Sequence, residues 1–175
     1  MTTGRLVPSL CLIGTLCTAA ANAETPLETP HPAYHHYEDP VFCSEWLRTH
    51  PHEPTSSDRR KHCVIAVATT YIDAEENSLP PEKQLFTDDV SRHHVGTPPN
   101  FAPNNRAKLM AEDSHKVISA IRNRQWTVEG DTAWILYDGY LNKDPDRIGF
   151  YVAERITLEE GLIHEILVAD VTIPK

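Results

Sequence analysis

Two adjacent histidines, His93 and His94, close the segment LFTDDVSRHHVG at residues 85–96. The ordinary pKa of imidazole is about 6.5, so such a side chain can accept or release a proton near neutral pH. Successive residues of a β-strand point to opposite faces of the sheet, so the two rings cannot both face one enclosed space. An imidazole that faces an apolar cavity would be a candidate general base.

A tyrosine and two acids elsewhere in the chain could complete such a site. Tyr71 lies on the apolar side of a predicted helix and could polarise a carbonyl group, while Glu154 or Asp73 could orient the imidazole. Asp73 follows Tyr71 by two residues, about 200° around a helix, so Glu154 is the preferred acid. The structural alternatives are a polar strand end for the histidine, core packing for Tyr71 and an outward ion pair of Glu154 with Arg155.

Three residues of the predicted strands are further candidates for ligand contacts. Trp126 and Tyr140 are interpreted as cross-strand packing or as walls of a ligand site. Asp138 interrupts an apolar strand, either as a polar group inside the pocket or as the mark of a bulge beside Gly139.

Apolar periodicity positions these residues on a small number of elements. The predicted helices are 58–77, a short one that Pro81 opens and that ends near Phe86, and one from Asn104 or Asn105 to about Asp113. The predicted strands are 90–95, 117–128, 132–141, 147–158 and 162–171, with a loop at 142–146. Helices followed by an antiparallel meander indicate an α+β domain in which a curved sheet folds over the first long helix.

The N-terminal segment has the pattern of a secretory signal. Arg5 precedes an apolar run from Leu6 to Leu16, and Ala21-Asn22-Ala23 is a small-residue cleavage site. The run is shorter than the roughly 20 residues of a membrane span. We therefore predict a signal peptide at 1–23, a secreted or periplasmic protein, and no membrane attachment after cleavage.

A leader rich in proline and histidine follows at 24–54, before the domain at 55–175. We expect an extended, partly disordered arm whose second half docks through Cys43 and the pair Trp46-Leu47. Its histidines lack the spacing of a metal site, so no metal is predicted. In an oxidising compartment Cys43 and Cys63 would form one disulfide, the alternative being a reactive thiol.

Charge excludes two classes of partner. The formal net charge is −9, which argues against binding to nucleic acid or to anionic membrane surfaces. The sequence contains no glycine-rich phosphate loop, no Cys-x-x-Cys pair and no Gly-x-Ser-x-Gly elbow.

Three stretches between residues 61 and 171 resemble a known superfamily. They are TYIDAEENS, LFTDDVSRHHVG and the tail RNRQWTVEGDTAWILYDGY with FYVAERITLEEGLIHEILV. In this order they are similar to the nuclear-transport-factor-2-like proteins, and among them to the SnoaL-like (polyketide-cyclase-like) and ketosteroid-isomerase-like proteins.

The resemblance implies a cone in which the first long helix and a concave sheet enclose a mostly apolar pocket. The general base of the ketosteroid isomerases lies eight residues after the Phe of the Leu-Phe motif, which is His94 here, in place of their aspartate. With one deletion, their hydrogen-bonding tyrosine falls on Tyr71, and the nearest match to their protonated acid is Glu154. Homodimerisation through the sheet is implied as well.

Two functions follow from this resemblance. The first is a cofactor-free isomerase, lyase or cyclase that acts on a small apolar carbonyl or hydroxyl compound, with His94 as the base. The second is a module without chemistry that binds a small apolar ligand or dimerises.

Overall fold

The computed structural model describes residues 39–77, 84–95, 103–111 and 118–173. The predicted signal sequence and the first part of the leader lie outside these ranges. The elements are α1 (Pro40–Thr49), α2 (Asp58–Asn77), β1 (Phe86–His94), α3 (Arg106–Ala111), β2 (Ile118–Glu129), β3 (Thr132–Leu141), β4 (Asp144–Glu159) and β5 (Leu162–Thr172). None of the helices in these ranges is both long enough and apolar enough to cross a membrane.

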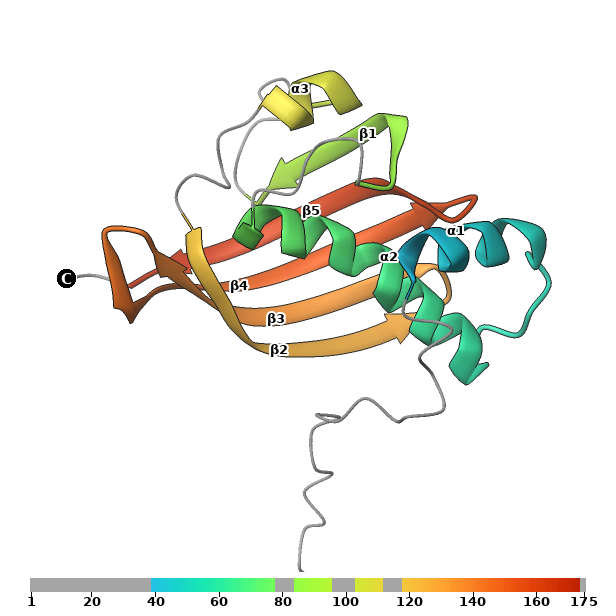
Figure 1. The fold of residues 1–175 in the computed structure, drawn as a ribbon, viewed down its shortest axis with the longest axis horizontal. Helices are drawn as coiled ribbons and strands as arrows, with labels where there is room; N and C mark the ends of the chain where they lie inside the picture. Colours follow the sequence, from blue (N-terminus) through green and yellow to red (C-terminus); the bar gives the residue numbers. More distant parts are fainter. Residues whose placement is uncertain (1–38, 78–83, 96–102, 112–117, 174–175) are drawn as a thin grey trace, which may run out of the picture.

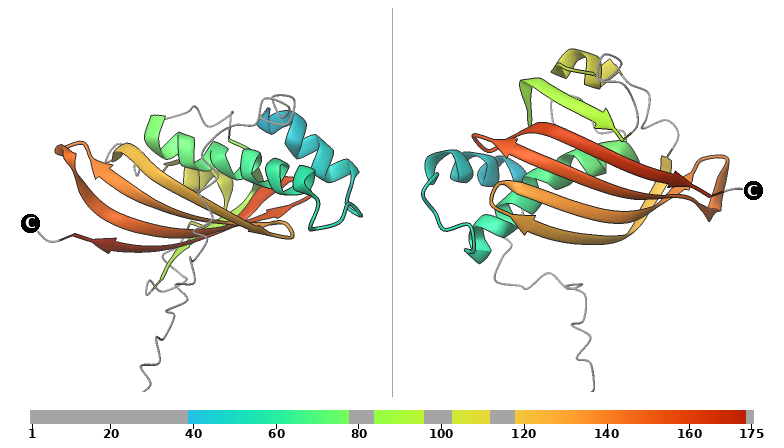
Figure 2. Two further views of the ribbon diagram at one scale, coloured as in Figure 1. Left: turned by 90° about the horizontal axis from the view of Figure 1, so that it is seen from below. Right: turned by 180° about the vertical axis from the view of Figure 1, so that it is seen from behind.

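The five strands form one curved sheet in the order β1-β5-β4-β3-β2. Strand β1 pairs with β5 in parallel, and the other neighbours are antiparallel. Helix α2 crosses the concave face of the sheet, α1 lies at one end of α2, and α3 lies beside β1 (Figures 1 and 2). The predicted α+β cone is therefore confirmed.

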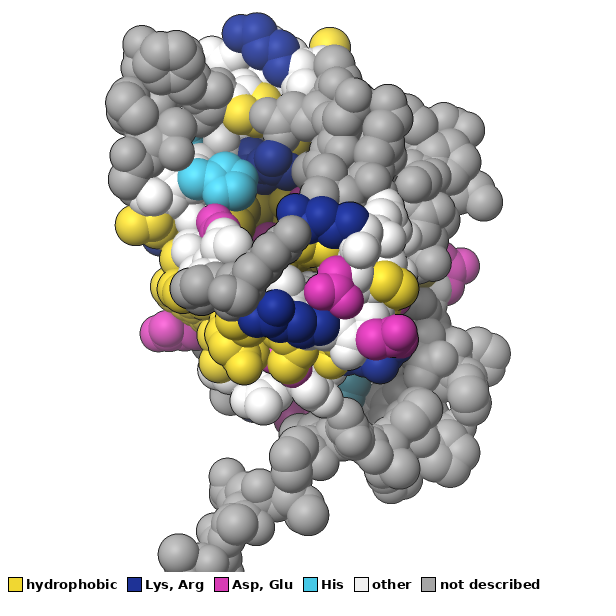
Figure 3. Space-filling model, turned by 90° about the vertical axis from the view of Figure 1, so that its left-hand side faces the viewer, with side chains coloured by type: hydrophobic (Ala, Val, Ile, Leu, Met, Phe, Trp, Pro, Cys, Tyr) yellow, Lys and Arg dark blue, Asp and Glu magenta, His cyan; other side chains and the backbone are white. Residues whose placement is uncertain are grey.

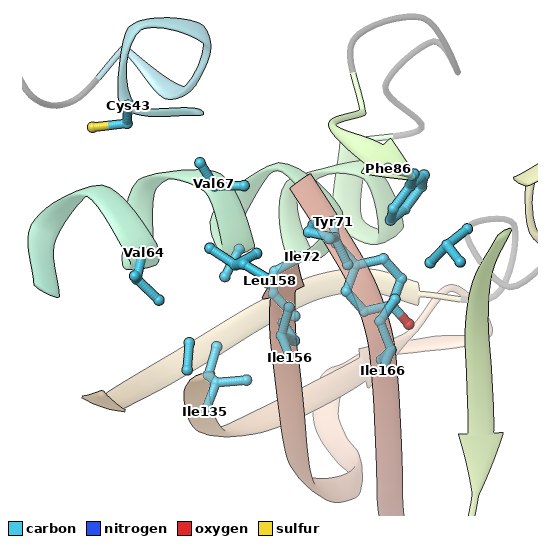
Figure 4. Packing of buried hydrophobic residues seen from close by; sticks show 14 of the residues in the cluster. Cys43, Val64, Val67, Tyr71, Ile72, Phe86, Ile135, Ile156, Leu158 and Ile166 are labelled. Carbon is cyan, nitrogen blue, oxygen red and sulfur yellow. The ribbon is translucent and has the colours of Figure 1, made fainter. Parts of the chain in front are cut away.

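The core fills the space between α2 and the concave face of the sheet. Residues of one face alternate along each strand, as with Ile135 and Tyr137 of β3 and Ile156 and Leu158 of β4, which are all buried. Helix α2 contributes buried residues at helical spacing, which are Val64, Val67, Tyr71 and Ile72 (Figure 4) and also Ala68.

Helix α1 replaces the extended arm that we expected in the second half of the leader. The Asp39 carboxylate caps it by accepting hydrogen bonds from the backbone N–H groups of Val41 and Phe42, at 2.9 and 3.3 Å, and Pro40 occupies its first turn. This is a standard helix start. The expected docking residues Cys43, Trp46 and Leu47 are buried along one side of this helix.

A disulfide between Cys43 and Cys63 joins α1 to α2, as predicted. Their sequence separation is 20 residues, and closing a loop of that size stabilises a fold by about 3 kcal/mol in the chain-entropy model. Gly161, in the turn between β4 and β5, fits closely beneath α1. A Cβ atom there would lie 2.2 Å from the Ser44 carbonyl oxygen, and the φ of +79° also favours glycine.

Two predicted boundaries are wrong. Phe86 begins β1 instead of ending a helix, and the preceding Gln84 and Leu85 are not helical. The loop expected at 142–146 is a tight connection, because β4 already begins at Asp144. Pro145 is tolerated in this strand because β5 pairs with β4 only from Phe150 onward, so one edge of β4 needs no donor at Pro145.

Candidate functional site

A cavity of about 230 Å³ lies between α2 and the concave face of the sheet. Its apolar walls are Ile118, Phe150, Val152 and Val168. Its polar lining is Tyr71, Glu75, Arg92, His94, Tyr137, Glu154, Asp170 and Thr172. Figure 3 views the end of the molecule toward which β1 runs, where hydrophobic, charged and histidine side chains gather together.

Simple periodicities bring the polar residues to this cavity. Tyr71 and Glu75 are four residues apart on α2 and therefore share one face. Arg92 and His94 are two residues apart on β1 and point to the same side of the sheet. The residues of β4 and of β5 that line the cavity are likewise two positions apart and therefore face the same side of the sheet.

A buried ion pair lines the cavity. The Tyr71 hydroxyl donates a hydrogen bond to Glu75 Oε1 at 2.7 Å. Arg92 Nη1 lies 3.3 Å from both Glu75 Oε1 and the Tyr71 hydroxyl oxygen, and the side chains of Arg92 and Glu75 are each only 9% exposed. Glu75 thus accepts hydrogen bonds from a neutral donor and a cationic donor.

Tyr137 connects this pair to a second buried acid. Its hydroxyl donates to Glu154 Oε1 at 2.9 Å and lies 3.4 Å from Glu75 Oε2. Glu154 is 2% exposed, and within the described ranges its Oε2 atom has no hydrogen-bond partner. The sequence resemblance implied a place for Glu154 in the site, and in the structure Glu154 is a buried acid and not half of an outward ion pair.

Different contacts separate the proton affinities of the two buried acids. Burial raises the pKa of Glu154 well above its usual range, and the negative charge of Glu75 raises it further. Burial also raises the pKa of Glu75, but the Tyr71 hydrogen bond and the Arg92 charge oppose this increase. As the pH rises, Glu75 therefore loses its proton at a lower pH than Glu154 does. The pKa values of Tyr71 and Tyr137 are raised mainly by burial, so both hydroxyl groups stay neutral.

His94 lies at the mouth of the cavity. It lines the cavity as the strand alternation requires, whereas His93 does not. Its side chain is 42% exposed, and its Nδ1 atom lies 3.5 Å from Asp170 Oδ1. The Asp170 carboxylate, which the sequence analysis did not consider, can thus orient the imidazole.

Two other predicted contacts lie away from the cavity. Asp73 forms an ion pair with Arg124 at 2.7 Å, which ties α2 to β2. Its separation from Tyr71 around the helix is the one expected. Trp126 packs as a partly buried residue against the core and does not line the cavity.

Asp138 and Tyr140 also do not line the cavity. The Asp138 carboxylate accepts a hydrogen bond from Asn123 Nδ2 at 2.5 Å, and the Tyr140 ring stacks with the Arg122 guanidinium. Of the two interpretations of Asp138, the bulge fits, because the strand register shifts between Gly139 and Tyr140.

Gly139 itself has a role in shaping the cavity. A Cβ atom at this position would lie 2.1 Å from the ring of Phe150, which is one of the cavity walls. The absence of a side chain on β3 therefore allows the aromatic ring of β4 to lie across the strand.

Sequence reasoning missed Glu75 and Arg92 as site residues. The available signal was a charged side chain at an otherwise apolar position: Glu75 continues the buried face of α2, and Arg92 shares the inward face of β1 with Val90. In the described part of the chain, no group of three or more histidine, cysteine or carboxylate side chains could hold a metal ion.

Comparison with known proteins gives a family and a fold. Residues 57–168 match the family described as "Domain of unknown function (DUF8021)". No curated protein matches the sequence. A "putative ketosteroid isomerase" from Kribbella flavida DSM 17836 has a similar structure, with a TM-score of 0.51 and 14% identity over 64% of this chain and 80% of that one.

Two further solved structures agree with this fold. An "NTF-2 like protein of unknown function" from Burkholderia xenovorans LB400 has a TM-score of 0.51 and 14% identity, over 64% of this chain and 85% of that one. A de novo designed protein with a curved β-sheet has a TM-score of 0.52 and 14% identity, over 67% and 89% of the two chains. The chain therefore shares its fold with solved proteins described as NTF2-like, as the sequence resemblance implied.

Proposed function

This chain belongs to the family of the domain of unknown function DUF8021, and we propose that its cavity binds a small apolar molecule and acts on it without a cofactor. One observation carries the proposal: an apolar cavity holds an imidazole at its mouth and an uncommitted, buried carboxyl group inside. Apolar walls with a few convergent polar groups are typical of small-molecule sites. The Kribbella flavida protein of similar fold, described as an isomerase, supports the same class of activity.

Glu154 is the hydrogen-bond donor to the ligand in this proposal. Its pKa is raised by burial, so the carboxyl group is neutral and its hydrogen can point from Oε2 to a carbonyl or hydroxyl oxygen. Tyr71, which the sequence resemblance suggested for this role, already donates its hydrogen to Glu75. We therefore assign Tyr71 to holding Glu75 in place and Glu154 to stabilising the oxyanion.

His94 is the base in this proposal. The neutral imidazole removes a proton from the carbon next to the carbonyl group, and the electron pair moves to the oxygen that Glu154 stabilises. Return of the proton to another carbon would complete an isomerisation. Asp170, 3.5 Å from His94 Nδ1, orients the ring for this transfer.

A proton-exchange experiment tests this role before any natural substrate is known. Apolar ketones and lactones that raise the melting temperature of the protein are incubated with it in D₂O, and deuterium uptake beside the carbonyl group is followed by NMR. His94→Ala is expected to slow the exchange by about 10²- to 10⁴-fold, the usual contribution of a general base. His93→Ala is the matched control, because His93 does not line the cavity. Equal rates in the two variants would contradict the proposal.

A binding module without chemistry is the second candidate. The exposure of His94 at the cavity mouth favours it, because a base in contact with water is less well placed for proton abstraction. In that case the ligands still bind, the wild-type protein catalyses no exchange, and His94→Ala changes only their affinity.

We also propose that the chain is secreted. The pattern of residues 1–23 supports this, and a disulfide is compatible with an oxidising compartment. N-terminal sequencing of the protein exported from its host is expected to begin at Glu24; a chain that retains residues 1–23 would contradict the cleavage.

The outer face of the sheet is a proposed dimer interface, as the sequence resemblance implied. Its exposed apolar residues are Trp134, Leu136, Tyr151 and Val171. Trp134→Glu is expected to weaken self-association at least tenfold in sedimentation experiments, because a charge would be buried at the contact. Val41→Glu, on the exposed side of α1, is the control. A wild-type chain that stays monomeric at high concentration would rule out the dimer.

A further inference from the structure

Two buried carboxyl groups share one hydroxyl group in this cavity. Glu75 comes from α2 and Glu154 from β4, and the Tyr137 hydroxyl lies 3.4 Å from the first and 2.9 Å from the second. Two ionised carboxylates so close to one hydroxyl and away from water would repel one another strongly. A hydroxyl group carries a single hydrogen, so Tyr137 can donate fully to only one of them.

The charged and titratable groups around these acids can be counted element by element. Strand β1 contributes Arg92 and His94, and β5 contributes Asp170; α2 and β3 add only the neutral tyrosines. His94 and Asp170 lie at the mouth, with side chains 42% and 41% exposed, and they pair with each other. Within the described ranges, Arg92 is therefore the buried cation that lines the cavity together with the two buried acids.

We propose that the ion pair between Arg92 and Glu75 determines the charge of the cavity. The Glu75 carboxylate neutralises the buried guanidinium group of Arg92, and Glu154 therefore remains a neutral acid. Arg92 and Glu75 are positioning residues, because they act on a ligand only through the proton of Glu154. When Glu75 cannot ionise, the charge passes to Glu154, which then becomes the counterion of Arg92. The donation of this proton to a ligand rests on the proposed function. The number of protons that Glu75 and Glu154 hold together in the ligand-free protein does not.

The geometry supports each part of this account. Arg92 Nη1 contacts Glu75 Oε1 directly, and the Tyr71 hydroxyl donates to the same oxygen. As an anion, Glu75 is therefore better stabilised by hydrogen bonds than Glu154 is. Glu154 accepts a hydrogen bond at Oε1 from Tyr137, which leaves Oε2 to carry the hydrogen. The Arg92 charge also favours the ionised form of Glu154, so the two acids compete for one cation.

Infrared spectroscopy of the ligand-free full chain tests this proton count. A protonated carboxyl group has a C=O band separate from that of carboxylates, and its shift in D₂O identifies it. At neutral pH we expect a band from one buried carboxylic acid in the wild type, which Glu154→Gln removes. We expect Glu75→Gln to remove it as well, although Glu154 is still present, because Glu154 ionises to pair with Arg92.

Three results would overturn the proposal: a wild-type spectrum without this band, a band that persists in Glu154→Gln, or a band of full intensity in Glu75→Gln. The last result would mean that burial alone protonates Glu154. The wild type and Glu154→Gln decide the first two even where Glu75→Gln does not fold. Glu165→Gln, which removes a partly buried acid paired with Arg155, is the matched control and should leave the band unchanged. The infrared experiment uses no ligand, so its outcome is independent of the proton-exchange experiment. Either experiment can fail while the other gives the expected result.

Discussion

Arg92→Met is expected to lower the free energy of unfolding by about 3–5 kcal/mol at neutral pH, the usual cost of removing one partner of a buried ion pair. The arginine and Glu75 side chains are each 9% exposed, so removing one partner leaves the other charge largely withdrawn from bulk water. Glu75 would have to stay ionised without its cation or take up a proton, and either change costs free energy. Denaturation by urea, followed by circular dichroism, measures the loss.

Arg48→Met provides the control for this prediction. Arg48 contacts Glu45 at 2.5 Å, but the two side chains are 54% and 60% exposed. Exposed pairs of this kind contribute little to stability, because water and salt screen their charges. A double variant, Glu75→Leu with Arg92→Met, should recover much of the loss, since buried pairs can often be replaced by apolar residues. Equal effects of Arg92→Met and Arg48→Met would show that the buried pair does not stabilise the fold.

Glu154→Gln is expected to become more stable than the wild type as the pH rises. The pKa of Glu154 is raised in the folded state, chiefly by burial, above its value of about 4.3 in the unfolded chain. Between these two pKa values the folded state holds a proton that the unfolded state has released, so wild-type stability falls with increasing pH. One proton corresponds to about 1.4 kcal/mol per pH unit. Glutamine is neutral in both states and lacks this dependence.

Urea denaturation from pH 5 to pH 8 would measure the difference between the two proteins. Comparing them cancels the titration of groups away from the cavity, including Asp89, whose pKa is lowered mainly by a hydrogen bond with Thr87. We expect the gap between the curves to widen with pH until Glu154 ionises in the folded state and to stay constant above that point. Glu165→Gln should run parallel to the wild type. A gap that does not change with pH would mean that Glu154 is ionised in the folded protein throughout this range.

Local patterns in the sequence were sufficient for most of the elements. The spacing of Val64, Val67 and Tyr71 predicted α2 with its observed bounds, because a single buried face imposes the helical period. The run of large apolar and aromatic residues in 132–141 predicted β3, because such residues are enriched in strands. Helix α1 was not predicted: a leader rich in proline and histidine suggested an extended arm, although Asp39-Pro40 is a helix start.

For the candidate site, the sequence by itself determined which residues could share a face: His94 rather than His93, and Tyr71 without Asp73. Those results depend only on the periods of a strand and a helix. The pairing of Glu75 with Arg92 and the isolation of Glu154 Oε2 were decided by the tertiary structure alone. The physical reason is that a charged residue is ordinarily exposed, and its burial becomes favourable only when a partner from a distant element, here β1 against α2, arrives with the opposite charge.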